Sequence, residues 1–211
     1  MPGVLFSVEL RWFLEGSPPA TLERWFRSGP FPPGGGGTRR DEYLEDSKQR
    51  ELGVKKRQGI EGIEIKGLLD VRPRPQEPFA GRLQFWTKWN SPALSIDHVP
   101  RIVVDKTRWL RKFDTTGADV CELALDEKER PRDSGRMLPA QGCGIELVSL
   151  LTDGSQTRWS TFAFEAFGPS SSLEQSLART IDALTPPDSG ALAQGAELSY
   201  PEWLATLRGA A

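Results

Sequence analysis

The 211-residue sequence predicts an α+β protein that is mainly antiparallel β, with an eight- or nine-stranded tunnel-like barrel and peripheral helices. Alternation of apolar and polar residues, the pattern of a strand with two different faces, recurs along most of the chain. Few helices interrupt these segments, which favours a closed or strongly curved antiparallel sheet over an α/β arrangement. Seven Trp and ten Phe residues supply large apolar surface for a core.

The first predicted elements are a strand over 4–13 and a short helix over 20–27. The strand alternates apolar residues at even positions with polar residues at positions 7, 9 and 11. The helix has its large apolar residues spaced for one face. The Gly- and Pro-rich stretch 29–37, which includes the run Gly34–Gly37, has the composition of a flexible loop.

Further strands are predicted from the same alternation. They cover 40–46, 52–58, 62–68, 80–89, 101–112, 118–126, 143–151 and 156–167. The last two are joined by Thr152–Ser155, which contains Asp-Gly and therefore indicates a hairpin. A helix is predicted over 171–184, because Leu173, Leu177 and Ile181 form one stripe.

No internal repeat or shift in composition divides the chain, so residues 1–187 are predicted to form one domain. Residues 188–211 are predicted to be a C-terminal tail, with a short helix after Tyr200-Pro201 that packs on the domain. No apolar run approaches the roughly 18 residues of a membrane-spanning helix, and the first residues lack a secretory signal. We therefore expect a cytoplasmic protein without a membrane partner.

The composition argues against several classes of function. A net charge of −2 does not suit nucleic-acid binding through bulk charge. The single histidine, His98, is expected at the surface, and it leaves too few ligands for a structural zinc site and argues against a Ser-His-Asp triad. Cys121 and Cys143 are expected to be buried free thiols.

Cationic residues share one face of several predicted strands. These faces carry Lys55 and Arg57; Glu64 and Lys66; Arg82, Gln84 and Lys88; and Lys106 and Arg108. Cations that converge in a concave site bind several phosphates, because Arg forms bidentate hydrogen bonds and Lys supplies a point charge. The carboxylates that offer oxygen ligands for Mg²⁺ are Glu9, Glu122, Asp126 and Glu146. The alternative is an exposed sheet face on which these cations pair with Glu across strands.

Six short motifs follow one another along the chain, and their order is informative. They are Ser7-Val8-Glu9-Leu10-Arg11, Tyr43-Leu44-Glu45-Asp46, Lys55-Lys56-Arg57, Glu64-Ile65-Lys66, Lys106-Thr107-Arg108 and Glu146-Leu147-Val148. In this order the sequence resembles the CYTH superfamily, the triphosphate tunnel metalloenzymes, over residues 4 to 184. That family opens with a Glu-x-Glu-x-Lys strand and continues through Arg-x-Arg and Thr-x-Lys strands to a late Glu-x-Glu strand.

The resemblance implies a closed tunnel whose cations bind a tri- or polyphosphate and whose glutamates hold Mg²⁺ or Mn²⁺. Together with the cation pattern, it indicates as phosphate-binding residues Arg11, Lys55, Arg57, Lys66, Arg82, Lys88, Lys106 and Arg108. The metal ligands are expected to be Glu9, Glu146 and Asp126. The implied chemistry is hydrolysis of organic triphosphates or inorganic polyphosphate, or cyclisation of ATP in some members.

Three residues depart from the family pattern. Ser7 stands at the first Glu of the opening strand, and Val148 at the second Glu of the late pair. Loss of two carboxylates weakens Mg²⁺ binding, because this ion depends on a few charged oxygens. Glu64 replaces the usual Thr and is expected to pair with Lys55 or Lys66, which lowers the positive field.

Three functions follow from these residues. The favoured one is a divergent module that binds a triphosphate- or polyphosphate-type anion or a protein partner, with impaired metal catalysis. The first alternative is an active metal-dependent phosphohydrolase. The second is a nucleic-acid-binding component of a larger assembly, in which Trp86, Trp89 and Trp109 stack on bases. Tryptophans exposed in loops favour that alternative, whereas tryptophans packed in the barrel wall do not.

Overall fold

The computed structural model describes residues 3–46, 48–77, 79–133, 137–185, 187 and 190–209, without the side chains of residues 208 and 209. Residue 188, where the predicted tail begins, lies outside this part of the chain. Among the described residues, no helix is both long and apolar enough to cross a membrane.

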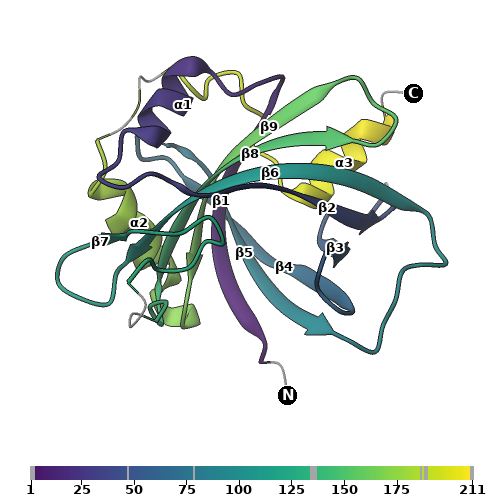
Figure 1. Ribbon diagram of the computed structural model, residues 1–211, viewed down its shortest axis with the longest axis horizontal. Helices are drawn as coiled ribbons and strands as arrows, with labels where there is room; N and C mark the ends of the chain where they lie inside the picture. The colour runs from purple at the N-terminus through teal and green to yellow at the C-terminus, as the bar shows by residue number, and fades with distance from the viewer. Residues whose placement is uncertain are drawn as a thin grey trace.

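Eight antiparallel strands close into a barrel, and a ninth strand lies beside it (Figure 1). The strands are β1 (Leu5–Glu15), β2 (Gly34–Leu44), β3 (Leu52–Arg57), β4 (Ile63–Arg74), β5 (Gly81–Ser91), β6 (Arg101–Asp114), β7 (Cys121–Leu123), β8 (Gly142–Thr152) and β9 (Arg158–Phe167). The order around the barrel is β2-β3-β4-β5-β1-β9-β8-β6, and pairing of β2 with β6 closes it. Among the described strands, β7 pairs only with β6. The predicted fold class is confirmed.

Helices α1 and α2 lie on one side of the barrel and α3 on the other (Figure 1). Their bounds are α1 Ala20–Arg27, α2 Leu173–Asp182 and α3 Tyr200–Gly209, with a short 3₁₀ turn η1 over Ser170–Ser172. Helix α1 has the bounds that the sequence predicts, and α2 ends two residues before the predicted end at 184.

The main apolar core lies outside the barrel wall, between strands β1, β8 and β9 and the helices α1 and α2. Val8, Leu10 and Trp12 of β1 belong to this core, together with Leu22 of α1 and Leu177 of α2. Each side chain of this size stabilises the fold by about 1.5–3 kcal/mol when it is fully buried. Because the even-numbered residues of β1 face this core, the odd-numbered residues point into the barrel.

Helix α3 divides the barrel interior into two parts. Trp203 of α3 is fully buried and stacks on Phe13 of β1, with ring centroids 5.0 Å apart. Val104 of β6 and Val148 of β8 belong to the same apolar cluster. Phe13, Val104 and Val148 each lie two positions from a charged residue on the same strand face. These charged residues are Arg11, Lys106 and Glu146. One part of the interior is therefore apolar and filled by α3, and the other part is polar.

A capping box fixes the start of α3. The hydroxyl oxygen of Ser199 accepts a hydrogen bond from the Glu202 N–H at 3.2 Å, and the Ser199 N–H donates to the Glu202 carboxylate at 2.7 Å. The same carboxylate accepts hydrogen bonds from Arg82 at 3.1 Å and Gln84 at 3.0 Å, both on β5. Helix α3 is thereby tied to the barrel wall at its first turn.

The run Gly34–Gly37 is the clearest error of the sequence prediction, because it forms the first part of strand β2 and not a loop. Gly34 and Gly35 pair with β6, and the register shifts between Gly35 and Thr38 in a bulge. Gly35 has a φ of +88°, and a Cβ at this position would lie 2.5 Å from the backbone oxygen of Arg108. Composition suggests a loop, but the glycines allow a close, bulged approach to β6.

Other predicted elements need smaller corrections. The segment predicted over 118–126 contributes only the three-residue strand β7, because the chain turns back after Leu123. Cys143 is a buried free thiol as predicted, whereas Cys121 is exposed. His98 is exposed as predicted. The hairpin at Asp153-Gly154 is confirmed, with the left-handed φ of +75° at Gly154.

A matched pair of glycine variants tests the bulge. Gly35→Ala is expected to lower the free energy of unfolding by more than about 1 kcal/mol, because alanine is strained at positive φ and its Cβ meets the backbone of β6. Gly37→Ala, with no atom within 4 Å of the added Cβ, is expected to change it by less than about 0.5 kcal/mol. Urea unfolding followed by tryptophan fluorescence measures both; equal effects would contradict the assignment.

Candidate functional site

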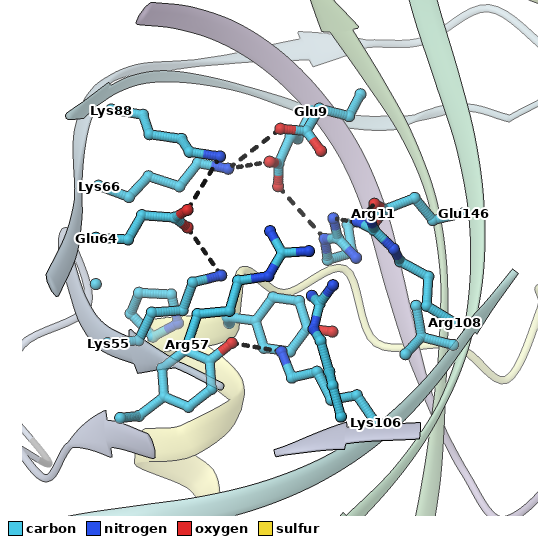
Figure 2. Close-up of a pocket in the computed structure, with 17 residues that line it drawn as sticks. Glu9, Arg11, Lys55, Arg57, Glu64, Lys66, Lys88, Lys106, Arg108 and Glu146 are labelled. Atoms are coloured by element: carbon cyan, nitrogen blue, oxygen red, sulfur yellow. Dashed lines mark hydrogen bonds and ion pairs between the residues drawn. The ribbon is translucent and has the colours of Figure 1, made fainter. Parts of the chain in front are cut away.

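The polar part of the barrel interior contains a cavity of about 100 Å³ (Figure 2). Eight cationic side chains line it: Arg11, Arg39, Lys55, Arg57, Lys66, Lys88, Lys106 and Arg108. Four carboxylates also line it: Glu9, Glu64, Glu146 and Glu165. Tyr200 and Pro201 of α3 contribute to the wall on the side of the apolar part.

The period-two geometry of the strands brings these residues together. Glu9 and Arg11 on β1 lie two positions apart, as do Lys55 and Arg57 on β3 and Lys106 and Arg108 on β6. In a closed barrel every strand has one face that points inward, so alternate residues converge on the axis. Of the eight predicted phosphate-binding residues, all but one line this cavity.

The exception is Arg82, which the structure places away from the cavity. Its guanidinium donates to the Glu202 carboxylate at 3.1 Å and to the backbone carbonyl of Glu197 at 3.1 Å. The sequence pattern places Arg82 on the same strand face as Lys88, and this face does point inward. Arg82 lies beside α3, however, where it pairs with Glu202 in the first turn of that helix.

Asp126, the third predicted metal ligand, is also separate from the cavity. It lies in the turn after β7, where its carboxylate accepts hydrogen bonds from the backbone N–H groups of Lys128 at 2.9 Å and Arg130 at 2.8 Å. Its other oxygen pairs with the Arg130 side chain. Glu122 pairs with Arg111 through two hydrogen bonds of 2.8 and 2.6 Å. Only Glu9 and Glu146 of the predicted carboxylates reach the cavity.

Both of these glutamates are neutralised by cations. Glu9 contacts Arg11 at 3.4 Å through one oxygen and Lys66 through the other. Glu146 contacts Arg11 at 3.2 Å and Arg108 at 2.8 Å, again through different oxygens. Burial by itself would raise the pKa of Glu9, but the charges of Lys66 and Arg11 outweigh it and lower this pKa to about 2. The pKa of Glu146 is lowered in the same way by Arg108 and Arg11.

The donor set of the cavity does not fit a hard divalent cation. Mg²⁺ needs charged oxygens that are free to coordinate it, and both oxygens of Glu9 and of Glu146 already contact a cation. Glu165, opposite Glu9 on β9, lies 3.9 Å from Lys66, and burial together with the charge of Glu9 raises its pKa. Within the described part of the chain, no three His, Cys, Asp or Glu side chains form a group that could hold a metal.

Glu64 holds two further cations in place. Its carboxylate pairs with Lys55 at 2.8 Å and with Lys88 at 3.2 Å, as the dashed lines in Figure 2 show. Burial would raise the pKa of Glu64, but the charges of Lys55 and Lys88 lower it to about 2. The expected pairing with Lys55 is present, whereas Lys66 pairs with Glu9 instead.

Asp41 provides a counter-charge behind the cavity wall. It is fully buried, and its oxygens lie 3.3 Å from Arg39, 3.4 Å from Lys106 and 3.8 Å from Lys55. Burial would raise the pKa of Asp41, but these cations lower it. Lys106 also lies over the Tyr200 ring, 3.7 Å from its centroid, and burial lowers the pKa of this lysine well below its usual value.

Arg57 differs from the other cations of the cavity. Among the described residues, its side chain has no ion pair and no hydrogen bond, and it points toward the middle of the cavity (Figure 2). Burial, followed by the charges of Arg39 and Arg108, lowers the pKa of Arg57. Three guanidinium groups thus repel one another in one region of the cavity, which favours an anion between them.

Arg39 was missed by the sequence prediction, although it lines the cavity. It precedes the predicted strand 40–46 and follows the glycine run, so the sequence pattern places it in no predicted strand or helix. The signal was its period-two spacing with Asp41 and Tyr43, which places all three on one face of β2.

The three tryptophans considered for base stacking lie in the barrel wall. Trp86 and Trp89 belong to β5 and Trp109 to β6, so none of the three is in a loop. Trp86 is 1% exposed, and the Lys66 ammonium lies 5.2 Å from its ring centroid. Their placement does not favour stacking on nucleic-acid bases.

Comparisons with known proteins do not name a family for this chain. No protein-family model matches it, and no curated protein matches it. The closed antiparallel barrel is compatible with the tunnel that the sequence resemblance implies. The arguments about function therefore depend on the residues of the cavity.

Glu64→Gln tests the charge balance of the cavity through the pH dependence of the free energy of unfolding. The carboxylate has a pKa of about 2 in the folded protein and of 4.5 in the unfolded chain. It therefore stabilises the fold above pH 4.5, and this contribution is lost as the pH falls toward 2. Wild type is expected to exceed the variant by up to about 3 kcal/mol in the free energy of unfolding near neutral pH. The difference is expected to shrink below pH 4.5.

Urea unfolding at a series of pH values measures this difference. Glu23→Gln is the control, because the Glu23 side chain on α1 is 42% exposed and pairs with Arg27. That variant is expected to stay within about 0.5 kcal/mol of wild type throughout. A stability difference for Glu64→Gln that does not change with pH would contradict the role given to this carboxylate.

Proposed function

We propose that this protein binds a short polyanion of the triphosphate or polyphosphate type inside its barrel, as a module with impaired metal catalysis. The observation that carries the proposal is the half-buried guanidinium of Arg57, which has no ion pair among the described residues and lies beside Arg39 and Arg108 in the cavity. Partial burial of a cation without a counter-ion costs free energy, and an anionic ligand would supply the missing charge.

The chemistry of the lining supports phosphate as the recognised group. Planar guanidinium groups match the oxygen atoms of a phosphate bidentately, and lysine ammonium groups add point charges. Eight cations face four carboxylates around the cavity, and they remain in excess when Asp41 behind the wall is added. A volume of about 100 Å³ suits a narrow phosphate chain better than a peptide.

The carboxylates support a binding role over hydrolysis. The CYTH resemblance would assign Glu9 and Glu146 to a metal, but both are engaged by cations from three strands. Ser7 and Val148 supply no carboxylate at the two positions where the family has one. Compared with the family that the sequence resembles, this chain retains more of the residues expected to bind phosphate than of those expected to bind a metal.

Arg57→Ala is expected to weaken binding of tripolyphosphate by at least about tenfold, because one charged hydrogen-bond donor is lost. The free energy of unfolding is expected to stay equal or to rise, since Arg57 has like charges as its main neighbours. Isothermal titration calorimetry measures the affinity and urea unfolding the stability. Arg82→Ala, which removes the same charge outside the cavity, is expected to bind as wild type does. Equal losses in both variants would contradict the proposal.

Phosphate release separates the module from the hydrolase. With Mg²⁺ or Mn²⁺, wild type is expected to release no phosphate from tripolyphosphate, ATP or thiamine triphosphate above a protein-free control. A colorimetric phosphate assay measures this. Turnover that is lost in Glu9→Ala would establish the hydrolase instead.

A further inference from the structure

Arg11 lies between the two carboxylates that the family pattern assigns to a metal. Its Nε is 3.4 Å from Oε2 of Glu9, and its Nη2 is 3.2 Å from Oε2 of Glu146 (Figure 2). Its Nη1 donates to the Thr161 hydroxyl at 3.5 Å. The side chain of Arg11 is only 3% exposed, so this bridge is shielded from water.

The strand register explains how the bridge forms. Arg11 of β1 and Glu146 of β8 are not neighbours, because β9 lies between their strands. Both are in register with Ala163 of β9, which is opposite Arg11 on one side and opposite Glu146 on the other. The small side chain of Ala163 leaves room for the long arginine to reach across β9 to the glutamate. The bridge is thus built into three adjacent strands.

A guanidinium in this position neutralises two carboxylates, as a divalent cation would. Two carboxylates that converge on one point require positive charge there, and a metal ion is the usual source. Arg11 supplies that charge permanently, because a guanidinium does not lose its proton in proteins. The remaining oxygens of the pair are held by Lys66 and Arg108. A metal would have to displace buried ion pairs to enter.

We infer that Arg11 stands where the resembled family would hold a divalent cation, so that the protein binds its polyanion in metal-free form. This inference rests on the proposed polyanion-binding function. Free polyphosphate carries more negative charge than its Mg²⁺ complex, and the cations of the cavity attract that charge directly. Mg²⁺ in solution therefore competes with the protein for the ligand.

The first experiment measures tripolyphosphate binding by calorimetry in EDTA and in excess Mg²⁺. Wild type is expected to bind in EDTA and to bind at least about tenfold more weakly in Mg²⁺. Binding that requires Mg²⁺ would overturn the inference and leave the proposed function intact. No binding in either buffer would overturn the proposed function, and the inference with it.

The second experiment asks whether removal of Arg11 opens a metal site. Arg11→Ala is expected to bind Mn²⁺ through Glu9 and Glu146, as seen by electron paramagnetic resonance and by a rise in melting temperature, without any polyanion. Wild type and Arg11→Lys are expected to show neither signal, since a cation remains. The double variant Arg11→Ala, Glu146→Gln is expected to lose both signals.

Arg111→Ala is the matched control, because Arg111 is an equally buried arginine that pairs with Glu122 away from the cavity. It is expected to lose stability without binding Mn²⁺. Mn²⁺ binding by wild type as tight as by Arg11→Ala would overturn the inference. So would a folded Arg11→Ala, judged by circular dichroism, that binds no Mn²⁺. If Arg11→Ala does not fold, the calorimetry on wild type decides.

Discussion

The charge network that crosses the barrel interior is the constraint on which the rest of the structure depends. Closing the sheet brings cations of several strands to the wall of one cavity, where their repulsion is less screened than in water. The chain Lys66–Glu9–Arg11–Glu146–Arg108 alternates the sign of the charge and so makes this arrangement stable. Removing one member would leave a buried partner without compensation.

The same network determines what the cavity offers a ligand. Glutamates that neutralise cations are not free to coordinate a metal, and cations that are neutralised attract an anion less strongly. Arg57, with Arg39 and Arg108 beside it, is the place where compensation is incomplete. Helix α3 confines the cavity to one part of the interior, because Trp203 fills the other part. The position of the proposed binding site therefore follows from where positive charge is left without a counter-charge.

Much of the fold was predictable because its causes are local. The alternation in β1, β8 and β9 shows directly in the sequence, and so do the spacing of α1 and the Asp-Gly turn. The convergence of Lys55, Lys106 and the other cations of the cavity was predictable, because alternate residues of a strand share one face and the inward faces of a barrel meet. Gly34–Gly37 was not predictable as a strand, because its glycines are explained only by the close approach of β6.

The sequence by itself determined the alternation of most strands, the cations that recur on one face of them, and the presence of Ser7 and Val148 where the family that it resembles has glutamates. Only the tertiary structure decided which charges pair. Arg11 and Glu146 are far apart in the chain and on non-adjacent strands, and their contact depends on the register of both with Ala163. Arg82 has the same sequence signature as Lys88 but is tied to α3. Pairing depends on distances across the barrel, and alternation along one strand contains no information about them.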